Sequence, residues 1–292
     1  MFDLHIHTNY SDGVCSVEQV LKMAEEKKLN TISITDHNTT IAYVDLEIEK
    51  IRKIFTGKII YGIEMITSFK GSIIEILGYG FDNFELIDKF FEDFYNNLEK
   101  NQIYKEVRLN LLKKIDNLNL KYDPIFKTEY NTILRYETML YDSLLKCNED
   151  LKDILKEEYT PTSKEFFRKI ITNPNSKFYC DFSPLSPKLS DVLNLIKKNN
   201  GYTFLAHPYV YKKENLKEFL TDLYKEYKID GIEAYYYNLS KEEIEFIEQF
   251  AKENKLLVSG GSDFHGEELR PNKIGEVNIE QLEFLQIMKK TI

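Results

Sequence analysis

The chain has 292 residues, of which 42% are hydrophobic and 30% are charged, as in a soluble globular protein with a sizeable core. Its 48 acidic and 39 basic side chains give a net charge of −9, which argues against a surface that binds long nucleic acids. It has no apolar run of the about 20 residues that a membrane span requires, and it does not begin like a secretory signal. The cysteines are odd in number and widely spaced, which favours free thiols (Cys15, Cys147 and Cys180). We therefore expect a cytoplasmic protein without a membrane partner.

The first 81 residues alternate strand-like runs with amphipathic stretches. Ser16 precedes Glu18 and Gln19 and is expected to cap the first helix. The order of the elements is typical of an α/β protein with parallel strands. The expected strands are 2–8, 31–35, 58–63 and 72–81, and the expected helices are 16–28 and 39–55.

The middle zone, residues 82–188, is rich in Asn, Lys, Tyr and Leu and contains no histidine. Residues 90–118 are expected to be helical. We predict a mainly helical insertion or cap. The alternative is that this zone forms the periphery of the same domain as its flanks.

The last zone, residues 189–292, returns to strand–helix alternation. The expected helices are 189–199, 214–227 and 241–254, and the expected strands are 201–206, 231–236 and 256–259. Residues 1–81 and 189–292 are therefore predicted to form one α/β domain.

All five histidines lie in short motifs that suit metal ligands, and imidazole is the commonest metal ligand in proteins. Each motif comes at or just after the end of an expected strand, where the catalytic groups of parallel barrels collect. Taken singly, each motif also fits a turn, a cap or a structural pair. Their joint occurrence predicts one multi-metal active site. The motifs are His5-x-His7, Asp36-His37, Ala206-His207-Pro208 and Asp263-x-His265.

Three carboxylates extend this set. Asp12 lies in a polar loop, Glu64 ends an expected strand, and Glu75 interrupts an apolar run. A buried carboxylate without a partner costs several kcal/mol, so each is expected to meet a cation or a metal. For Glu75 the alternative is a salt bridge at the rim of the barrel.

In their order, these motifs resemble the PHP (polymerase and histidinol phosphatase) family. The resemblance implies a distorted (β/α)7 TIM-like barrel with a helical insertion, and a centre of two or three divalent ions (Mn, Fe or Zn). The motifs are His5-x-His7, Ser11-Asp12-Gly13, Thr35-Asp36-His37, Gly62-x-Glu64, Leu77-Gly78-Tyr79, Ala206-His207-Pro208 and Ser262-Asp263-x-His265.

The resemblance also implies which side chains bind each ion. One ion would take His5, His7, Glu64 and Asp263, a second would share Glu64 and add Glu75 and His207, and a third would take Asp12, His37 and His265.

The chain departs from the family pattern at two places. Glu75 stands where stand-alone members usually carry histidine, and a carboxylate favours Mn or Fe over an all-nitrogen zinc site. The Arg-Pro-His element of related phosphatases is missing from the insertion, where Arg135 is the nearest candidate for a phosphate contact. Arg270 is the second candidate. For both arginines the alternative is a solvated surface position.

The resemblance implies a metal-dependent phosphoric ester hydrolase that cleaves a small phosphate monoester by a metal-bridging hydroxide. Ser11-Asp12-Gly13 is similar to the branch that acts on nucleoside monophosphates and short oligonucleotides, so a short single-stranded oligonucleotide is a candidate partner. Glu64 and Asp263 would hold the ions, and His265 or a metal-bound water would protonate the leaving alkoxide. The alternatives are a histidinol-phosphate phosphatase, another metal-dependent hydrolase, and a metal-binding regulatory module without turnover.

Overall fold

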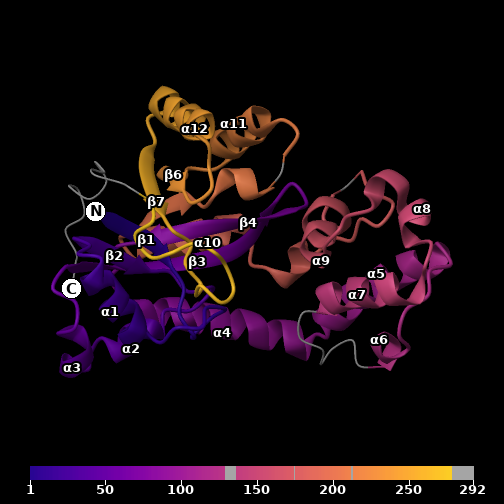
Figure 1. Ribbon diagram of the computed structural model, residues 1–292, viewed down its shortest axis with the longest axis horizontal. Helices are drawn as coiled ribbons and strands as arrows, with labels where there is room; N and C mark the ends of the chain where they lie inside the picture. Colours follow the sequence, from indigo (N-terminus) through magenta and orange to yellow (C-terminus); the bar gives the residue numbers. More distant parts are fainter. Residues whose placement is uncertain (129–135, 174, 212, 278–292) are drawn as a thin grey trace. The chain divides into compact units, whose positions relative to one another are not determined.

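The computed structural model describes residues 1–128, 136–173, 175–211 and 213–277, shown as coloured ribbon in Figure 1. The chain divides into two compact units. The first unit consists of Met1–Thr67, Ile74–Asp93 and the described part of Lys188–Ile292. The second consists of Ser68–Ile73 and the described part of Phe94–Pro187.

The first unit is organised by a sheet that has seven strands within the described residues, paired in sequence order. The pairs β1–β2, β2–β3, β5–β6 and β6–β7 run parallel, whereas β4 pairs with β5 in antiparallel register. The strands are β1 (Phe2–Ile6), β2 (Thr31–Ile34), β3 (Lys58–Phe69), β4 (Ser72–Tyr79), β5 (Tyr202–Leu205), β6 (Gly231–Tyr236) and β7 (Leu257–Gly261).

The two edges of this sheet meet, so it forms a nearly closed barrel. The backbone N–H of His7 donates to the carbonyl of Phe264 at 2.8 Å, just after the ends of β1 and β7. A Cβ atom on Gly261 would lie 2.4 Å from the backbone nitrogen of His5, so only glycine permits this close approach. The predicted distorted seven-stranded barrel is confirmed.

Strand β4 departs from the expected parallel arrangement. A two-residue turn at Lys70 and Gly71 joins β3 to β4, and both residues have positive φ (48° and 74°). Such a turn reverses the chain, as in a β-hairpin. The strand expected at 58–63 continues through Glu64 to Phe69, where the turn to β4 begins.

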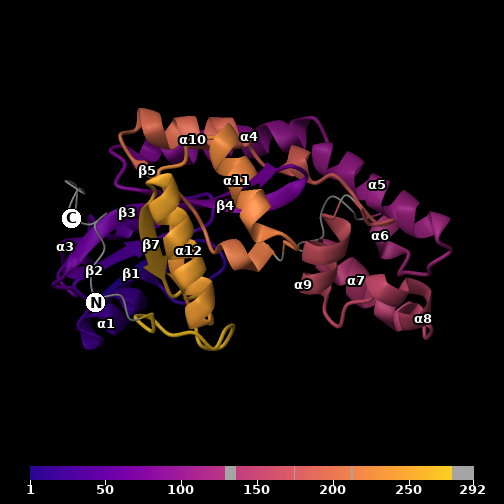
Figure 2. The same ribbon diagram turned by 90° about the horizontal axis from the view of Figure 1, so that it is seen from above.

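Helices cover the outside of the sheet. Helix α12 packs against β6 and β7, and α10 packs against β5 (Figure 2). Ser16 caps α1 as predicted, and its hydroxyl accepts the backbone N–H of Gln19. The helices of this unit include α1 (Val17–Glu26), α2 (Ala42–Asp45), α3 (Glu49–Arg52), α10 (Leu189–Lys198), α11 (Leu216–Glu226) and α12 (Lys241–Asn254), with a 3-10 turn at Pro208–Tyr211.

The single helix expected at 39–55 is wrong, because Ile48 is extended between α2 and α3. Ile41, Val44 and Ile48 are exposed, so residues 39–55 do not present the continuous buried face of a single amphipathic helix. No helix in the described part of the chain is long and apolar enough to cross a bilayer.

The second unit is helical and has its own hydrophobic core, which includes Leu111, Tyr141 and Phe166. The helix expected at 90–118 is interrupted, because Gln102 has a φ of 54°. Helix α4 (Phe84–Lys100) begins in the first unit and ends in the second. The other elements are α5 (Ile103–Asn117), α6 (Ile125–Thr128), α7 (Tyr136–Cys147), α8 (Leu151–Leu155), α9 (Ser163–Glu165), 3-10 turns at Lys156–Glu158 and Ser183–Leu185, and a π-helix at Phe166–Ile171.

Candidate metal centre

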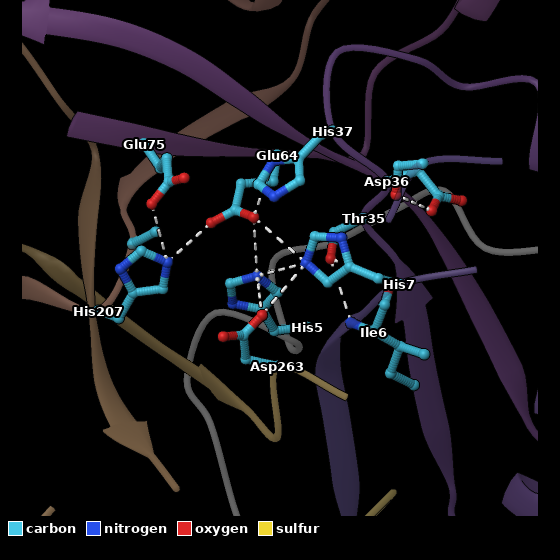
Figure 3. Close-up of polar contacts among 12 residues, drawn as sticks. His5, Ile6, His7, Thr35, Asp36, His37, Glu64, Glu75, His207 and Asp263 are labelled. Atoms are coloured by element: carbon cyan, nitrogen blue, oxygen red, sulfur yellow. Dashed lines mark hydrogen bonds and ion pairs between the residues drawn. The ribbon is translucent and has the colours of Figure 1, made fainter. Parts of the chain in front are cut away.

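The five histidines and four carboxylates of the predicted site come together at one end of the barrel. Figure 3 shows His5, His7, His37, Glu64, Glu75, His207 and Asp263 with their side chains directed toward one another. They are His5 in β1, His7 and Asp12 after β1, His37 after β2, Glu64 in β3, Glu75 in β4, His207 after β5, and Asp263 and His265 after β7. Among the described residues they make three groups of ligand atoms, and within each group the atoms lie within 4.8 Å of one another.

The first group consists of His5, His7, Glu64 and Asp263, as the resemblance implies. The Nε2 atoms of the two histidines are 3.1 Å apart. Oε2 of Glu64 lies 3.3 and 3.2 Å from these two nitrogens, and Oδ1 of Asp263 lies 3.5 and 3.3 Å from them. All four side chains are buried. Two imidazole nitrogens and two carboxylate oxygens in this arrangement suit one divalent cation.

The second group corresponds to the third ion that the resemblance implies. It contains Asp12, His37 and His265, and the structure adds His7 to it. Oδ1 of Asp12 lies 3.1 Å from Nε2 of His265 and 3.6 Å from Nδ1 of His7. These three atoms are buried, yet none has a hydrogen-bond partner of normal geometry in the described structure. An unsatisfied buried polar atom costs about 1–3 kcal/mol, which a cation between these atoms would relieve.

The third group contains His37, Glu64 and Glu75, with His207 beside it. Nε2 of His207 lies 2.9 Å from Oε1 of Glu64 and 3.3 Å from Oε2 of Glu75. Glu64 therefore presents Oε1 to His207, and Oε2 to His5, His7 and His37. A carboxylate placed in this way suits a bridging ligand.

Backbone conformation sets two of the candidate ligands apart. His207 has a φ of 24° and Asp263 a φ of 51°, in a backbone region that residues other than glycine rarely adopt. Such strain persists only where surrounding contacts impose it, and it is typical of functional sites.

The charges in the centre depend on one another. Burial alone would lower the pKa of His7, but hydrogen bonds with Asp263 and Glu64 raise it to about 9. Burial alone would raise the pKa values of Glu64 and Asp263, but the neighbouring histidines hold both well below their usual range. The pKa of His265 is lowered, chiefly by burial. The buried histidines and carboxylates of the centre therefore stabilise one another's charged forms.

Two acidic residues that were given no role in the sequence analysis support the centre. Asp36 accepts hydrogen bonds from the backbone N–H of Thr8 at 2.7 Å and the hydroxyl of Ser11 at 2.5 Å, so it holds the loop that carries Asp12. Glu233 in β6 is fully buried and contacts His5. Glu233 lies inside an apolar strand, and the same sequence pattern had identified Glu75 as a candidate ligand.

Of the two arginines predicted to contact the substrate, the structure describes Arg270. Nη1 of Arg270 contacts Oδ2 of Asp263, and the hydroxyl of Tyr236 donates to the same oxygen at 2.8 Å. Arg270 thus lies at the centre and braces a candidate ligand. Its side chain is 22% exposed, so a phosphate contact stays a prediction. Arg135 lies outside the described residues.

Comparison with known proteins was made for the sequence and for the fold. The model of the PHP domain family matches residues 3–257, a segment that holds every candidate ligand except Asp263 and His265. The 5′-3′ exoribonuclease Rnm of Salmonella typhimurium is 24% identical over 268 residues, which are 91% of this chain and 85% of that protein. A phosphoribosyl 1,2-cyclic phosphate 1,2-diphosphodiesterase of Eggerthella lenta is 24% identical over 280 residues, 94% of this chain and 97% of that protein.

A similar fold is found in a solved structure from Bifidobacterium adolescentis, a protein described as a metal-dependent phosphoesterase. The two structures superpose with a TM-score of 0.60 at 22% identity, covering 96% of this chain and 92% of that one. At this identity the likeness concerns the fold.

Proposed function

The chain belongs to the PHP domain family and is a metal-dependent phosphoric ester hydrolase, and from this premise we propose that it acts on short single-stranded RNA, releasing nucleotides from the 5′ end. The observation that carries the proposal is the three-part centre in which Glu64 faces two ion positions. The exoribonuclease relatives from Salmonella typhimurium and Haemophilus influenzae support the substrate class, because each aligns with about 90% of this chain.

The charge of the protein favours a short substrate. The net charge is −9, and the guanidinium of Arg270 at the centre is already paired with Asp263. Long nucleic acids are bound by many Lys and Arg contacts to phosphates. The ions themselves would therefore supply most of the positive charge that binds the substrate.

The proposed ligands are the nine side chains predicted from the sequence, with His7 facing two groups. Bound divalent ions would supply activation of water at neutral pH and stabilisation of negative charge on the phosphoryl group. Glu64 would supply ligand oxygens to two ions, and Asp36 holds the loop that carries Asp12. His265 directs Nδ1 at the carbonyl of Asp263 at 2.8 Å, which leaves Nε2 as a ligand atom. The role of His265 as proton donor to the leaving group stays a prediction.

The proposal is tested on metal-stripped protein reloaded with Mn, Fe or Zn. The substrates are 5′-labelled short oligoribonucleotides, nucleoside 3′- and 5′-monophosphates and histidinol phosphate. We expect metal-dependent release of mononucleotides from the 5′ end. Release of inorganic phosphate from monoesters, without cleavage of RNA, would contradict the exonuclease and favour the phosphate monoester predicted from the sequence.

A second candidate is hydrolysis of a cyclic phosphate of a sugar. It is favoured by the diphosphodiesterase relative, of which this chain covers 97%. Phosphoribosyl 1,2-cyclic phosphate is therefore included among the substrates. Its turnover in the absence of RNA cleavage would select this function.

We expect Glu75→His to change the preference of the centre for metals. Glu64, Glu75 and His207 would give an ion at the third group more oxygen than nitrogen ligands, and oxygen ligands suit Mn or Fe. Replacing Glu75 by histidine adds an imidazole, which suits Zn. The ratio of bound Zn to bound Mn, measured by mass spectrometry after competition, should rise by about tenfold, or about 1.4 kcal/mol.

Glu248→His is the matched control. Glu248 is half-buried on α12 and accepts a hydrogen bond from Tyr235. It contacts no candidate ligand in the described structure, so the metal ratio of this variant should equal that of the wild type. An unchanged ratio in Glu75→His would exclude Glu75 from the ligand set.

A further inference from the structure

Glu233 is a fully buried carboxylate that contacts two candidate ligands from two different strands. Oε1 accepts a hydrogen bond from Nδ1 of His5, at 2.9 Å. Oε2 accepts the backbone N–H of His207, at 2.8 Å. A buried ion of this kind stabilises a fold little more than a well-packed apolar side chain would, so its two specific partners point to another role.

The first contact determines which nitrogen of His5 carries the proton. With Nδ1–H donated to Glu233, the lone pair of Nε2 is left free. That atom faces Glu64 and Asp263 at 3.3 and 3.5 Å (Figure 3). The ring of His5 is thus held in the tautomer and orientation that a metal ligand needs.

The second contact holds the backbone of His207. Its φ of 24° is strained, so an opposing contact is needed to keep the residue in this conformation. Oε2 of Glu233 supplies that contact just after β5. The imidazole of His207 then reaches Glu64 and Glu75.

We propose that Glu233 is a positioning residue that links two ion positions, because one carboxylate orients His5 in the first group and His207 beside the third. This inference rests on the proposed metal centre. Glu233 itself binds no ion. Its effect is that the two ion positions gain or lose affinity together.

Glu233→Gln is the direct test, because glutamine has the same shape but its amide offers one oxygen acceptor. It can accept from Nδ1–H of His5 or from the N–H of His207, but not from both. We expect the affinity for Mn²⁺, measured by calorimetry on metal-stripped protein, to fall by about 10–100-fold. Turnover should recover when Mn²⁺ is raised, with the KM for the substrate unchanged. A merely structural role would not produce this recovery.

Glu248→Gln is the matched control, with the same chemical change at a glutamate that contacts Tyr235 of the same strand. Its Mn²⁺ affinity should equal that of the wild type. Wild-type affinity in Glu233→Gln would overturn the inference, whereas a wild-type protein that binds no metal would overturn the proposed function itself.

Two further measurements serve if glutamine at this position prevents folding. Glu233→Asp keeps the charge but shortens the side chain, and we expect an intermediate loss of Mn²⁺ affinity. In the zinc-loaded wild type, nitrogen NMR of labelled histidine should show His5 protonated at Nδ1. A His5 protonated at Nε2 would overturn the inference without any variant.

Discussion

His7→Ala is expected to lower the rate of substrate hydrolysis by about 10³-fold, which corresponds to about 4 kcal/mol of transition-state stabilisation. Nε2 of His7 lies in the first group of ligand atoms, and Nδ1 lies 3.6 Å from Oδ1 of Asp12 in the second. One substitution therefore removes a candidate ligand from two groups. The measurement is the hydrolysis rate with saturating metal, together with the number of ions bound per chain.

Every histidine of the chain lies in the centre, so none can serve as a matched control for His7→Ala. The control is instead a test that the variant folds. Circular dichroism of the metal-free protein should match that of the wild type. A folded His7→Ala protein that keeps its activity within about tenfold would exclude His7 as a ligand, since a tenfold change is only about 1.4 kcal/mol.

Asp263→Ala is expected to lower the free energy of unfolding of the metal-free protein by about 3 kcal/mol as well as to abolish hydrolysis. Asp263 is 4% exposed and is the partner of Arg270, so its removal leaves a mostly buried guanidinium without a carboxylate. In the double variant Asp263→Ala/Arg270→Ala that unpaired charge is gone. Urea unfolding should therefore show the double variant to be more stable than the sum of the two single changes predicts.

Lys273→Ala provides the matched control in the same loop. Lys273 lies 3.6 Å from Glu267, and both side chains are more than half exposed. Combined with Asp263→Ala, its effect should be additive within about 0.5 kcal/mol. If Asp263→Ala and Arg270→Ala are equally additive, the pair seen in the structure contributes no coupling.

The ligand set was predictable because it depends on local patterns. His5 and His7 are two residues apart in an extended segment, so their side chains share a side. Parallel strands also end on the same side of a barrel, which brings the residues after β1, β2, β5 and β7 together. The resemblance then implied three ligand groups. The structure brings these side chains close together, with His7 added to the second group, His37 added to the third, and His207 beside the third.

The direction of β4 was not predictable from periodicity, because alternation has the same form in parallel and antiparallel strands. The turn at Lys70 and Gly71 determines it, and both residues adopt positive φ there. Similarly, the apolar pattern of residues 39–55 did not reveal the extended conformation of Ile48.

The sequence by itself therefore determined the α/β class, which follows from periodicity. The resemblance carried by motifs a few residues long then implied the barrel and the residues of the candidate centre. Only the tertiary structure decided the partners of the buried charges. Glu233 and His5 are 228 positions apart, and Asp3 accepts the hydroxyl hydrogen of Ser262 across 259 positions. An acidic residue in an apolar strand shows that a partner is needed, because burial of a lone charge is costly. Which partner it meets is decided by how the strands close into a barrel.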